Sequence, residues 1–200
     1  MAERIVMNTG PLIALARMDA LDVPGQLPYE FICPSEVREE LDEGANLGYQ
    51  TIRPAWLTVI PLSASPSALS VAALDKGEAA VVQLALEKGL SRVSIDEVKA
   101  RRIATALGLS VVGSLGLIAR AKTLGIIPAM RPLVEKAMRD GIHYHSDLVE
   151  RVLSSVGEYG RSVTSLHRCS SAGRLIRLES PRRTFSRQRY CLRRFLLDLD

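Results

Sequence analysis

The fold is decided by residues 92–125, which read RVSIDEVKARRIATALGLSVVGSLGLIARAKTLG. This stretch contains two short apolar segments of strand type, and each is followed by a helical pattern that a glycine ends. In order, we predict a strand at 92–95, a helix at 96–107, a strand at 109–112 and a helix at 114–124. Strands that alternate with helices of about ten residues are typical of a parallel sheet with helical crossovers.

The same alternation continues on both sides of this stretch. We predict further strands at residues 4–7, 31–33 and 56–60, and helices at 11–18, 35–41, 76–88, 132–139 and 146–153. The predicted strands are short and nearly all apolar, as expected when helices bury both faces of a sheet. The predicted fold class is therefore α/β, a three-layer α/β/α sandwich with a short-stranded parallel sheet.

The charge of the chain is divided unevenly along its length. The formal net charge is +4, but residues 159–200 hold ten Arg and three acidic residues, whereas residues 1–158 hold 16 Lys and Arg against 19 Asp and Glu. The C-terminal segment thus carries +7 and the rest of the chain −3. The basic character belongs to the C-terminal segment, so it gives no evidence that the rest of the chain binds nucleic acid.

The sequence pattern changes near Gly157, and we predict one domain at residues 1–157 and a basic, Arg- and Ser-rich tail at 158–200. The tail has no steady apolar periodicity, so we expect it to be poorly ordered. Three interpretations stay open. The tail is an arm that contacts nucleic acid or a partner, a segment that lies on a membrane surface, or a passive extension such as an out-of-frame end of a gene.

Several classes of protein are excluded by composition. No apolar run approaches the roughly 18 residues that a membrane span needs, and the N-terminus lacks the pattern of a signal peptide. The three cysteines, Cys33, Cys169 and Cys191, are odd in number and far apart, which fits a reducing cytoplasm. Aromatic residues make up only 4% of the chain, so a base-stacking platform is not expected. We expect a cytoplasmic protein that does not enter the membrane.

Polar residues follow several of the predicted strands. Four segments place such residues near the carboxyl ends of the sheet, where open α/β folds bind ligands: Asn8, Glu40, Glu78, and Asp96 with its neighbour Glu97. Clustered carboxylates repel one another, so such a site is stable chiefly with a hard divalent cation such as Mg²⁺ or Mn²⁺. The chemistry that this arrangement suits is phosphodiester hydrolysis.

Each acidic residue also has a purely structural interpretation. Glu78 would favour the first turn of its helix through the helix dipole, without any ligand. Asp96 is a good N-cap, and the spacing of Ser94 to Glu97 fits a capping box. Glu40 can belong to a solvated helix face. Spacing alone leaves these alternatives open.

Five motifs in order resemble those of PIN-domain proteins, in particular a prokaryotic branch of predicted nucleic-acid-binding proteins with a PIN-like domain. They are IVMNTGPLIAL (5–15), LDKGEA (74–79), IDEVKAR (95–101), GSLG (113–116) and AKTLGII (121–127). The resemblance extends from about Arg4 to Glu158. It implies a PIN-like sandwich and a metal-dependent ribonuclease, and many such proteins are toxins of the VapBC type that a cognate antitoxin inhibits.

The resemblance assigns acidic site positions to this sequence residue by residue. The first falls on Asn8, the second on Glu40, the third on Glu78 and the fourth on Asp96 with Glu97 beside it. Asn8 departs from the acidic pattern, because an amide oxygen can ligate a cation but has no charge. The expected cofactor is Mg²⁺ or Mn²⁺, and the expected partners are an RNA substrate, an antitoxin protein and a second copy of the chain. The alternatives are a catalytically impaired PIN-like module that binds RNA or a partner protein, and an interaction protein whose sheet mouth is empty.

Three further residues are candidates for substrate binding, each with a structural alternative. Thr9 would hold a metal-bound water or bond its own turn. Arg101 would contact a phosphate or form an ordinary ion pair. Ser114 would present a helix N-terminus to a phosphate or cap its helix. The residues His143, Tyr144 and His145 have the spacing of two metal ligands, but a loop before a helix is the favoured interpretation.

Overall fold

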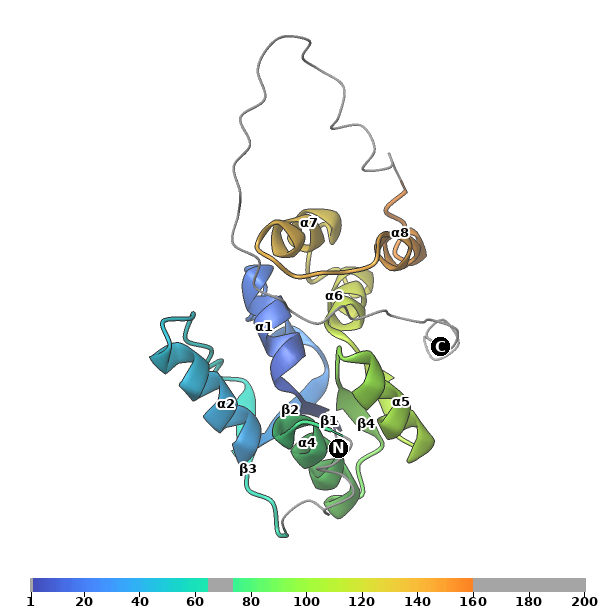
Figure 1. Cartoon of the computed structure of the whole chain (residues 1–200). Coiled ribbons are helices and arrows are strands. Elements are labelled where there is room, and N and C mark those ends of the chain that lie inside the picture. Colours follow the sequence, from blue (N-terminus) through green and yellow to red (C-terminus); the bar gives the residue numbers. More distant parts are fainter. Residues whose placement is uncertain (1, 65–73, 160–200) are drawn as a thin grey trace.

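A computed structural model describes residues 2–64 and 74–159 of the chain (Figure 1). The predicted tail lies outside the described residues from position 160 onward. The described residues form one layered α/β structure, and no helix among them is long and apolar enough to cross a membrane.

The centre of the molecule is a five-stranded sheet in which every neighbouring pair is parallel. The strands are β1 (Glu3–Met7), β2 (Tyr29–Pro34), β3 (Leu57–Ile60), β4 (Arg92–Ser94) and β5 (Ser110–Val112), in the spatial order β3-β2-β1-β4-β5. The chain therefore builds outward from β1 to β3 on one side and then continues from β4 to β5 on the other. The order reverses between β1 and β4.

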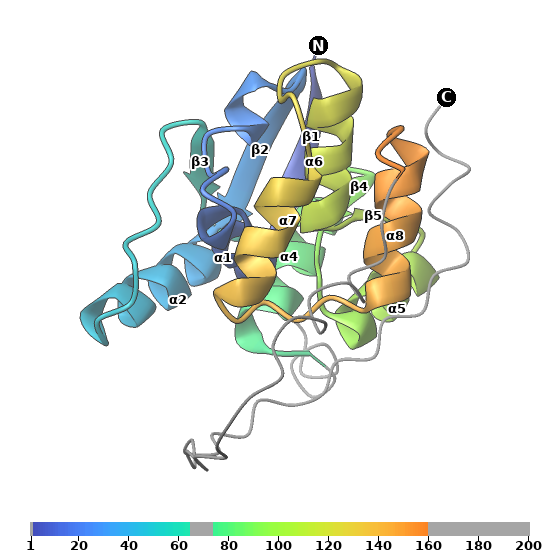
Figure 2. The ribbon, with the colours of Figure 1, turned by 90° about the horizontal axis from the view of Figure 1, so that it is seen from above.

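Helices lie on both faces of this sheet (Figures 1 and 2). They are α1 (Thr9–Arg17), α2 (Ser35–Asn46), α4 (Lys76–Glu87), α5 (Val98–Ala106), α6 (Ser114–Thr123), α7 (Arg131–Arg139) and α8 (Ser146–Ser155), with a short 3₁₀ turn, η1 (Pro24–Gln26). Helix α4 packs on β1, β2 and β4, while α1 packs against α6 and α7, and α8 against α6. The predicted three-layer sandwich is confirmed.

The sheet is buried in the way that its sequence predicts. Ile5, Val6 and Met7 of β1 are at most 1% exposed although their side chains alternate between the two faces, so both faces are covered. The outer strand β3 is more open, and Val59 on it is 40% exposed. Burial of the central strands fixes where their carboxyl ends lie, and the candidate site forms there.

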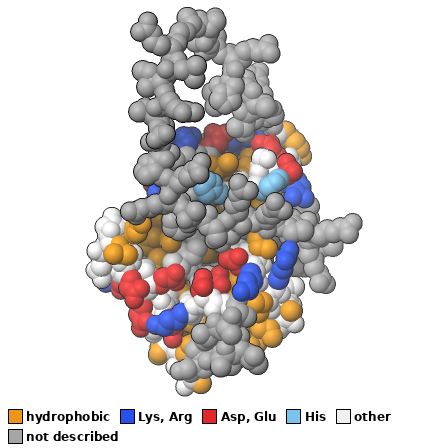
Figure 3. Space-filling view, in the orientation of Figure 1, with side chains coloured by type: hydrophobic (Ala, Val, Ile, Leu, Met, Phe, Trp, Pro, Cys, Tyr) orange, Lys and Arg blue, Asp and Glu red, His pale blue; other side chains and the backbone are white. Residues whose placement is uncertain are grey.

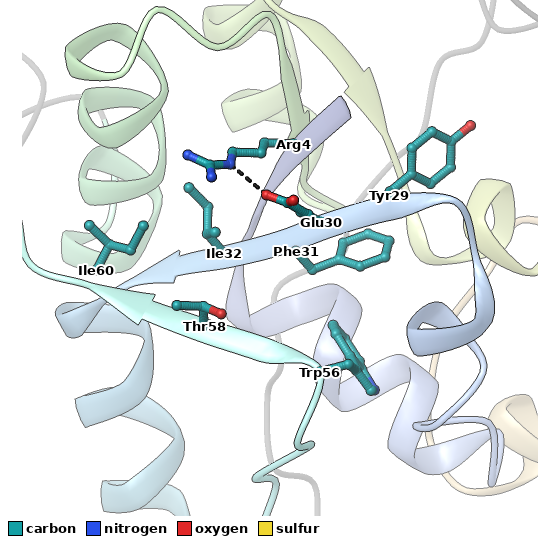
Figure 4. A pocket seen from close by; sticks show the side chains of 8 residues that line it. All are labelled: Arg4, Tyr29, Glu30, Phe31, Ile32, Trp56, Thr58 and Ile60. Atoms are coloured by element: carbon teal, nitrogen blue, oxygen red, sulfur yellow. Dashed lines mark hydrogen bonds and ion pairs between the residues drawn. The ribbon is translucent and has the colours of Figure 1, made fainter. Parts of the chain in front are cut away.

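A hollow of about 240 Å³ runs along β1, β2 and β3 (Figure 4). An exposed ion pair between Arg4 and Glu30 lies beside it, with the Arg4 Nε 2.7 Å from Glu30 Oε2, and Phe31 and Trp56 pack edge to face at one end. None of the candidate site residues lines this hollow. It is therefore separate from the carboxyl ends of β1 and β4.

Several helix boundaries differ from the sequence prediction by one or two residues, and two differences matter more. Helix α2, predicted at 35–41, continues through Gly44 to Asn46, and the chain turns at Gly48, whose φ of 90° suits glycine. Helix α5 begins at Val98 instead of Asp96, which changes the role of the acidic pair before it. Glycine inside a helix is tolerated when the following turns continue its hydrogen bonds.

The contacts of the described structure reach one residue beyond Gly157. The Glu158 carboxylate accepts hydrogen bonds from the Met130 and Arg131 backbone N–H groups at the start of α7, the second over 2.9 Å. A carboxylate at a helix N-terminus is favourable for the helix dipole. Glu158 therefore belongs structurally with α7.

Candidate metal site at the sheet mouth

The carboxyl ends of β1 and β4 form what we call the sheet mouth. The two strands are neighbours, and the Asn8 N–H donates to the Ser94 carbonyl oxygen over 3.0 Å, which extends their pairing. The strand order reverses between them, and open α/β sheets bind ligands at such a reversal. The residues of the surrounding elements that line this mouth divide into two groups.

The first group, which we call the α2–α4 side, consists of Asn8, Thr9, Glu40, Gly77 and Glu78. Thr9, on the first turn of α1, donates its hydroxyl proton to Glu40 Oε2 over 2.6 Å. Glu40 projects from α2, so this hydrogen bond joins two helices at the mouth. Thr9 thus orients a carboxylate, which is neither of the two roles considered from the sequence.

Gly77 allows this carboxylate and the Asn8 amide to approach α4 closely. A Cβ atom on Gly77 would lie 2.7 Å from Glu40 Oε2 and 3.5 Å from Asn8 Oδ1. Since real Cβ contacts are not this short, any other residue at position 77 would displace Glu40. The glycine of the LDKGEA motif is therefore explained by the space that the oxygen atoms occupy.

The Asn8 amide oxygen has no hydrogen-bond partner among the described residues, although Asn8 is only 6% exposed. A buried polar atom without a partner is costly and calls for an explanation, such as an ion. Its position beside Glu40 Oε2 fits a hard divalent cation, which prefers carboxylate and amide oxygens.

Glu78, in the first turn of α4, is buried at the same mouth and is 8% exposed. Its pKa is raised from 4.5 to about 7, chiefly by burial and also by the negative charges of Glu97, Asp75 and Glu40, while a hydrogen bond from the Asp75 N–H acts in the opposite direction. That N–H lies 3.3 Å from Glu78 Oε2, so Glu78 also closes a capping box with Asp75. Glu78 thus lies in the first turn of its helix, as its structural interpretation expects. Its ionised form is nevertheless disfavoured, because burial raises its pKa.

The second group, the α5–α6 side, consists of Asp96, Glu97, Arg101, Gly113 and Ser114. The prediction that Asp96 caps the following helix is wrong. Glu97 is the N-cap of α5 and accepts the Ala100 N–H over 2.7 Å. Ser94 forms no capping box, because its buried hydroxyl has no partner within the described part of the chain.

Asp96 instead accepts the Ser114 N–H over 2.9 Å at the start of α6. A Cβ on Gly113 would lie 2.6 Å from Asp96 Oδ1 and 3.1 Å from Arg101 Nη1, so this glycine also makes room for a carboxylate. Burial raises the pKa of Asp96, while the hydrogen bonds from the Ser114 N–H and hydroxyl and the charge of Arg101 act in the opposite direction. The Asp96 charge is therefore partly compensated within the protein.

Two of the expected substrate contacts have structural roles here. Ser114 is fully buried, and its hydroxyl oxygen lies 2.8 Å from the Tyr144 hydroxyl oxygen, so it neither faces solvent nor caps α6 with its side chain. The Arg101 guanidinium donates to the Ile95 carbonyl oxygen over 2.7 Å beside Asp96. The loop prediction for residues 143–145 is correct, and the His145 side chain caps α8 by accepting the Asp147 N–H.

The oxygen atoms that could ligate a cation at the mouth do not surround a single point. Within residues 2–64 and 74–159, no three His, Cys, Asp or Glu side chains are placed together so that they could hold a metal ion. Asn8, Glu40 and Glu78 are gathered on the α2–α4 side, whereas Asp96 and Glu97 are bonded to backbone N–H groups. Figure 3 shows acidic side chains in a band across one face of the molecule, with basic side chains at one end of the band.

Three residues at the mouth were not predicted from the sequence: Tyr144, which contacts Ser114, and Gly77 and Gly113, which leave space for carboxylates. Gly77 and Gly113 each stand next to a site carboxylate, and both lie inside quoted motifs, so their position in those motifs was an available signal. Tyr144 gave no such signal, because only the tertiary structure brings it to Ser114.

Comparison with known proteins gives one finding. A family model described as a PIN domain matches residues 4–158, which is more than half of the chain. Neither the curated proteins nor the solved structures give a match. PIN domains have a nuclease-like fold, are associated with nucleic-acid binding and generally use divalent metal ions. The match and the parallel α/β sandwich agree, and the chain belongs to the PIN-domain family.

Proposed function

We propose that this protein is a Mg²⁺- or Mn²⁺-dependent endoribonuclease whose cation binds at the sheet mouth. The observation that supports it most is the buried Asn8 Oδ1, which has no partner among the described residues and lies next to the Glu40 carboxylate. The raised pKa of Glu78 adds to this, because a cation would offset both the burial of the Glu78 charge and the repulsion from the neighbouring carboxylates.

Asn8, Glu40 and Glu78 would hold the cation from the α2–α4 side, with Asp96 and Glu97 facing it from the α5–α6 side. A bound Mg²⁺ or Mn²⁺ supplies an activated water and offsets the charge that develops on phosphate oxygens. Thr9 keeps Glu40 oriented, and Gly77 keeps the space into which both oxygens project. Because the pKa of Glu78 is raised to about 7, this side chain would release a proton when a cation binds near neutral pH.

The biological setting that we propose is a cytoplasmic toxin of a toxin–antitoxin pair. Its substrate would be RNA, a cognate antitoxin would inhibit it, and a second copy of the chain would form a homodimer. This part rests on the resemblance of the five motifs and on PIN-family membership. A small antitoxin-like reading frame beside the gene is the expected finding, and its absence would count against the toxin assignment.

A second candidate is a PIN-like module that binds RNA or a protein without cleaving it. The neutral Asn8 favours it, because the site has one negative charge fewer than a site with an acidic residue at this position. Affinity for a cation and activation of water both depend on that charge.

Cleavage of structured RNA by the purified chain distinguishes the two candidates. We expect cleavage with Mg²⁺ or Mn²⁺ and none with EDTA. Asp96→Asn should abolish it while the fold is preserved, since an amide can still accept the Ser114 N–H. Cleavage that survives EDTA, or an Asp96→Asn variant as active as the wild type, would exclude the metal-dependent mechanism.

A further inference from the structure

The C-terminal helices α7 and α8 supply none of the acidic positions, yet one residue between them reaches the sheet mouth. Tyr144 lies in the loop that joins these helices and is 9% exposed, whereas its neighbours His143 and His145 are exposed. Its hydroxyl oxygen is 2.8 Å from Ser114 Oγ, and Ser114 is fully buried. A buried tyrosine hydroxyl needs such a partner.

The protons in this contact can be assigned from the donors that are present. An ionised Asp96 only accepts hydrogen bonds, and the Ser114 hydroxyl has a single proton to donate. The Ser114 hydroxyl donates to Asp96, in addition to the Ser114 N–H. When the Ser114 hydroxyl gives its proton to Asp96, its oxygen accepts the hydrogen bond from the Tyr144 hydroxyl, 2.8 Å away.

This chain of donors ends on a tightly enclosed carboxylate. A Cβ atom added to Gly113 would lie 2.6 Å from Asp96 Oδ1. A Cβ atom added to Gly10 would lie 3.8 Å from the Asp96 Cβ. Asp96 therefore lies between the first turns of α6 and α1. Ser114, which bonds Asp96 through its N–H and Tyr144 through its hydroxyl, is therefore the residue through which Tyr144 reaches this carboxylate.

We propose that Tyr144 is a positioning residue, which fixes the Asp96 carboxylate at the sheet mouth through Ser114. The orientation of Asp96 is a property of the apo protein. Its consequence for cation affinity rests on the proposed function, and partners of this kind typically change metal affinity about 10- to 100-fold when they are removed. The α7–α8 pair thus acts on the mouth although it contributes no ligand.

Tyr144→Phe tests this proposal, because it removes one hydroxyl and keeps the ring. The first measurement is the ¹³Cγ chemical shift of Asp96 in the full-length chain without metal. We expect a clear shift change in Tyr144→Phe, and no further change when Tyr144→Phe is added to Ser114→Ala. Tyr29→Phe, in β2, is the matched control and should leave the Asp96 resonance in place. An unchanged Asp96 resonance in Tyr144→Phe, or the same additional change in the Ser114→Ala background, would overturn the proposal.

The second measurement is the Mg²⁺ affinity of the same variants, followed on the same resonances. We expect Tyr144→Phe to weaken Mg²⁺ binding about tenfold, and Tyr29→Phe to leave it unchanged. A changed Asp96 resonance together with wild-type Mg²⁺ affinity would overturn the link to the cation. If the wild type itself binds no Mg²⁺, the proposed function fails, and the Asp96 resonance alone still decides whether Tyr144 positions this carboxylate.

Discussion

On the α5–α6 side of the sheet mouth, each carboxylate accepts a hydrogen bond from a backbone N–H, and one of them also lies near a positive charge. Asp96 has the Ser114 N–H and the charge of Arg101, and Glu97 has the Ala100 N–H. On the α2–α4 side, the Glu78 carboxylate has one backbone N–H, three neighbouring negative charges and a pKa near 7, and the Asn8 oxygen next to Glu40 has no partner among the described residues.

The difference indicates where a positive charge is lacking. Like charges in a buried cluster raise one another's pKa unless a cation is present. The α5–α6 side already contains a cation, Arg101, and a helix N–H, which partly offset the burial that raises the pKa of Asp96. The α2–α4 side is the part of the mouth that a divalent ion would stabilise, and the following predictions test this contrast in order of expected size.

The largest effect is expected from Glu78→Gln at alkaline pH without metal. The folded-state pKa of Glu78 is raised above its ordinary value. Its ionisation therefore does not lower the free energy of unfolding well below pH 4.5, begins to lower it as the pH rises above 4.5, and lowers it by the full amount above pH 7. Glutamine removes that cost and keeps the bond to the Asp75 N–H. The free energy of unfolding at pH 8 should rise by about 3 kcal/mol. Chemical denaturation at pH 4 and at pH 8 in EDTA measures it.

The pH dependence supplies the control for this prediction. Wild type and Glu78→Gln should unfold alike at pH 4, where Glu78 is protonated in both the folded and the unfolded chain. Equal stability of the two proteins at pH 8 as well would mean that ionised Glu78 does not destabilise the folded protein. The α2–α4 side would then lack no positive charge relative to the α5–α6 side.

A smaller effect, and in the opposite direction, is expected from Gly113→Ala on the α5–α6 side, which should lower the stability of the protein. The backbone there is extended, with a φ of −105°, so alanine meets no backbone strain. Its Cβ would still lie 2.6 Å from Asp96 Oδ1, a carboxylate that Ser114 and Arg101 hold in place. Displacing it should cost about 2 kcal/mol, because a buried charge loses its partners. Thermal unfolding without metal is the measurement.

Gly77→Ala is the matched variant on the other side. Its Cβ meets the end of the exposed Glu40 side chain, which can swing toward solvent. Alanine also favours the helix by about 1 kcal/mol relative to glycine, so the apo protein should lose no stability. If Gly77→Ala destabilised the chain as much as Gly113→Ala, Glu40 would be held as firmly as Asp96, contrary to the account.

A smaller effect than that of Gly113→Ala is expected from Asn8→Asp. The two side chains have nearly the same shape, so packing changes little, and the new charge adds to a site that already lacks a cation. The apo protein should become slightly less stable, and Mn²⁺ should bind about tenfold tighter, equivalent to about 1.4 kcal/mol. Saturating Mn²⁺ would then raise the Tm of Asn8→Asp more than that of the wild type. Equal shifts would mean that Asn8 does not face a cation.

Much of the fold could be predicted because apolar periodicity and glycine stops report directly on strand and helix order. The meeting of Asn8, Glu40 and Glu78 at one mouth follows from the same order, since parallel strands end on one edge. Which member of the pair Asp96 and Glu97 would cap α5 could not be predicted. The choice depends on the Ser114 N–H, which is 18 positions from Asp96 along the chain. Tyr144 likewise meets Ser114 only in the tertiary structure, 30 positions away along the chain.

The most direct test of the central claim is a calorimetric titration of Mn²⁺ into the wild type, Glu40→Gln and Glu39→Gln. These adjacent residues of α2 differ in their surroundings: Glu40 bonds Thr9 at the mouth, while Glu39 pairs with Lys76 at an exposed position, 2.8 Å apart. We predict saturable Mn²⁺ binding that Glu40→Gln weakens by about tenfold or more and that Glu39→Gln leaves unchanged. No saturable binding in the wild type, or the same affinity in all three proteins, would contradict a cation site on the α2–α4 side.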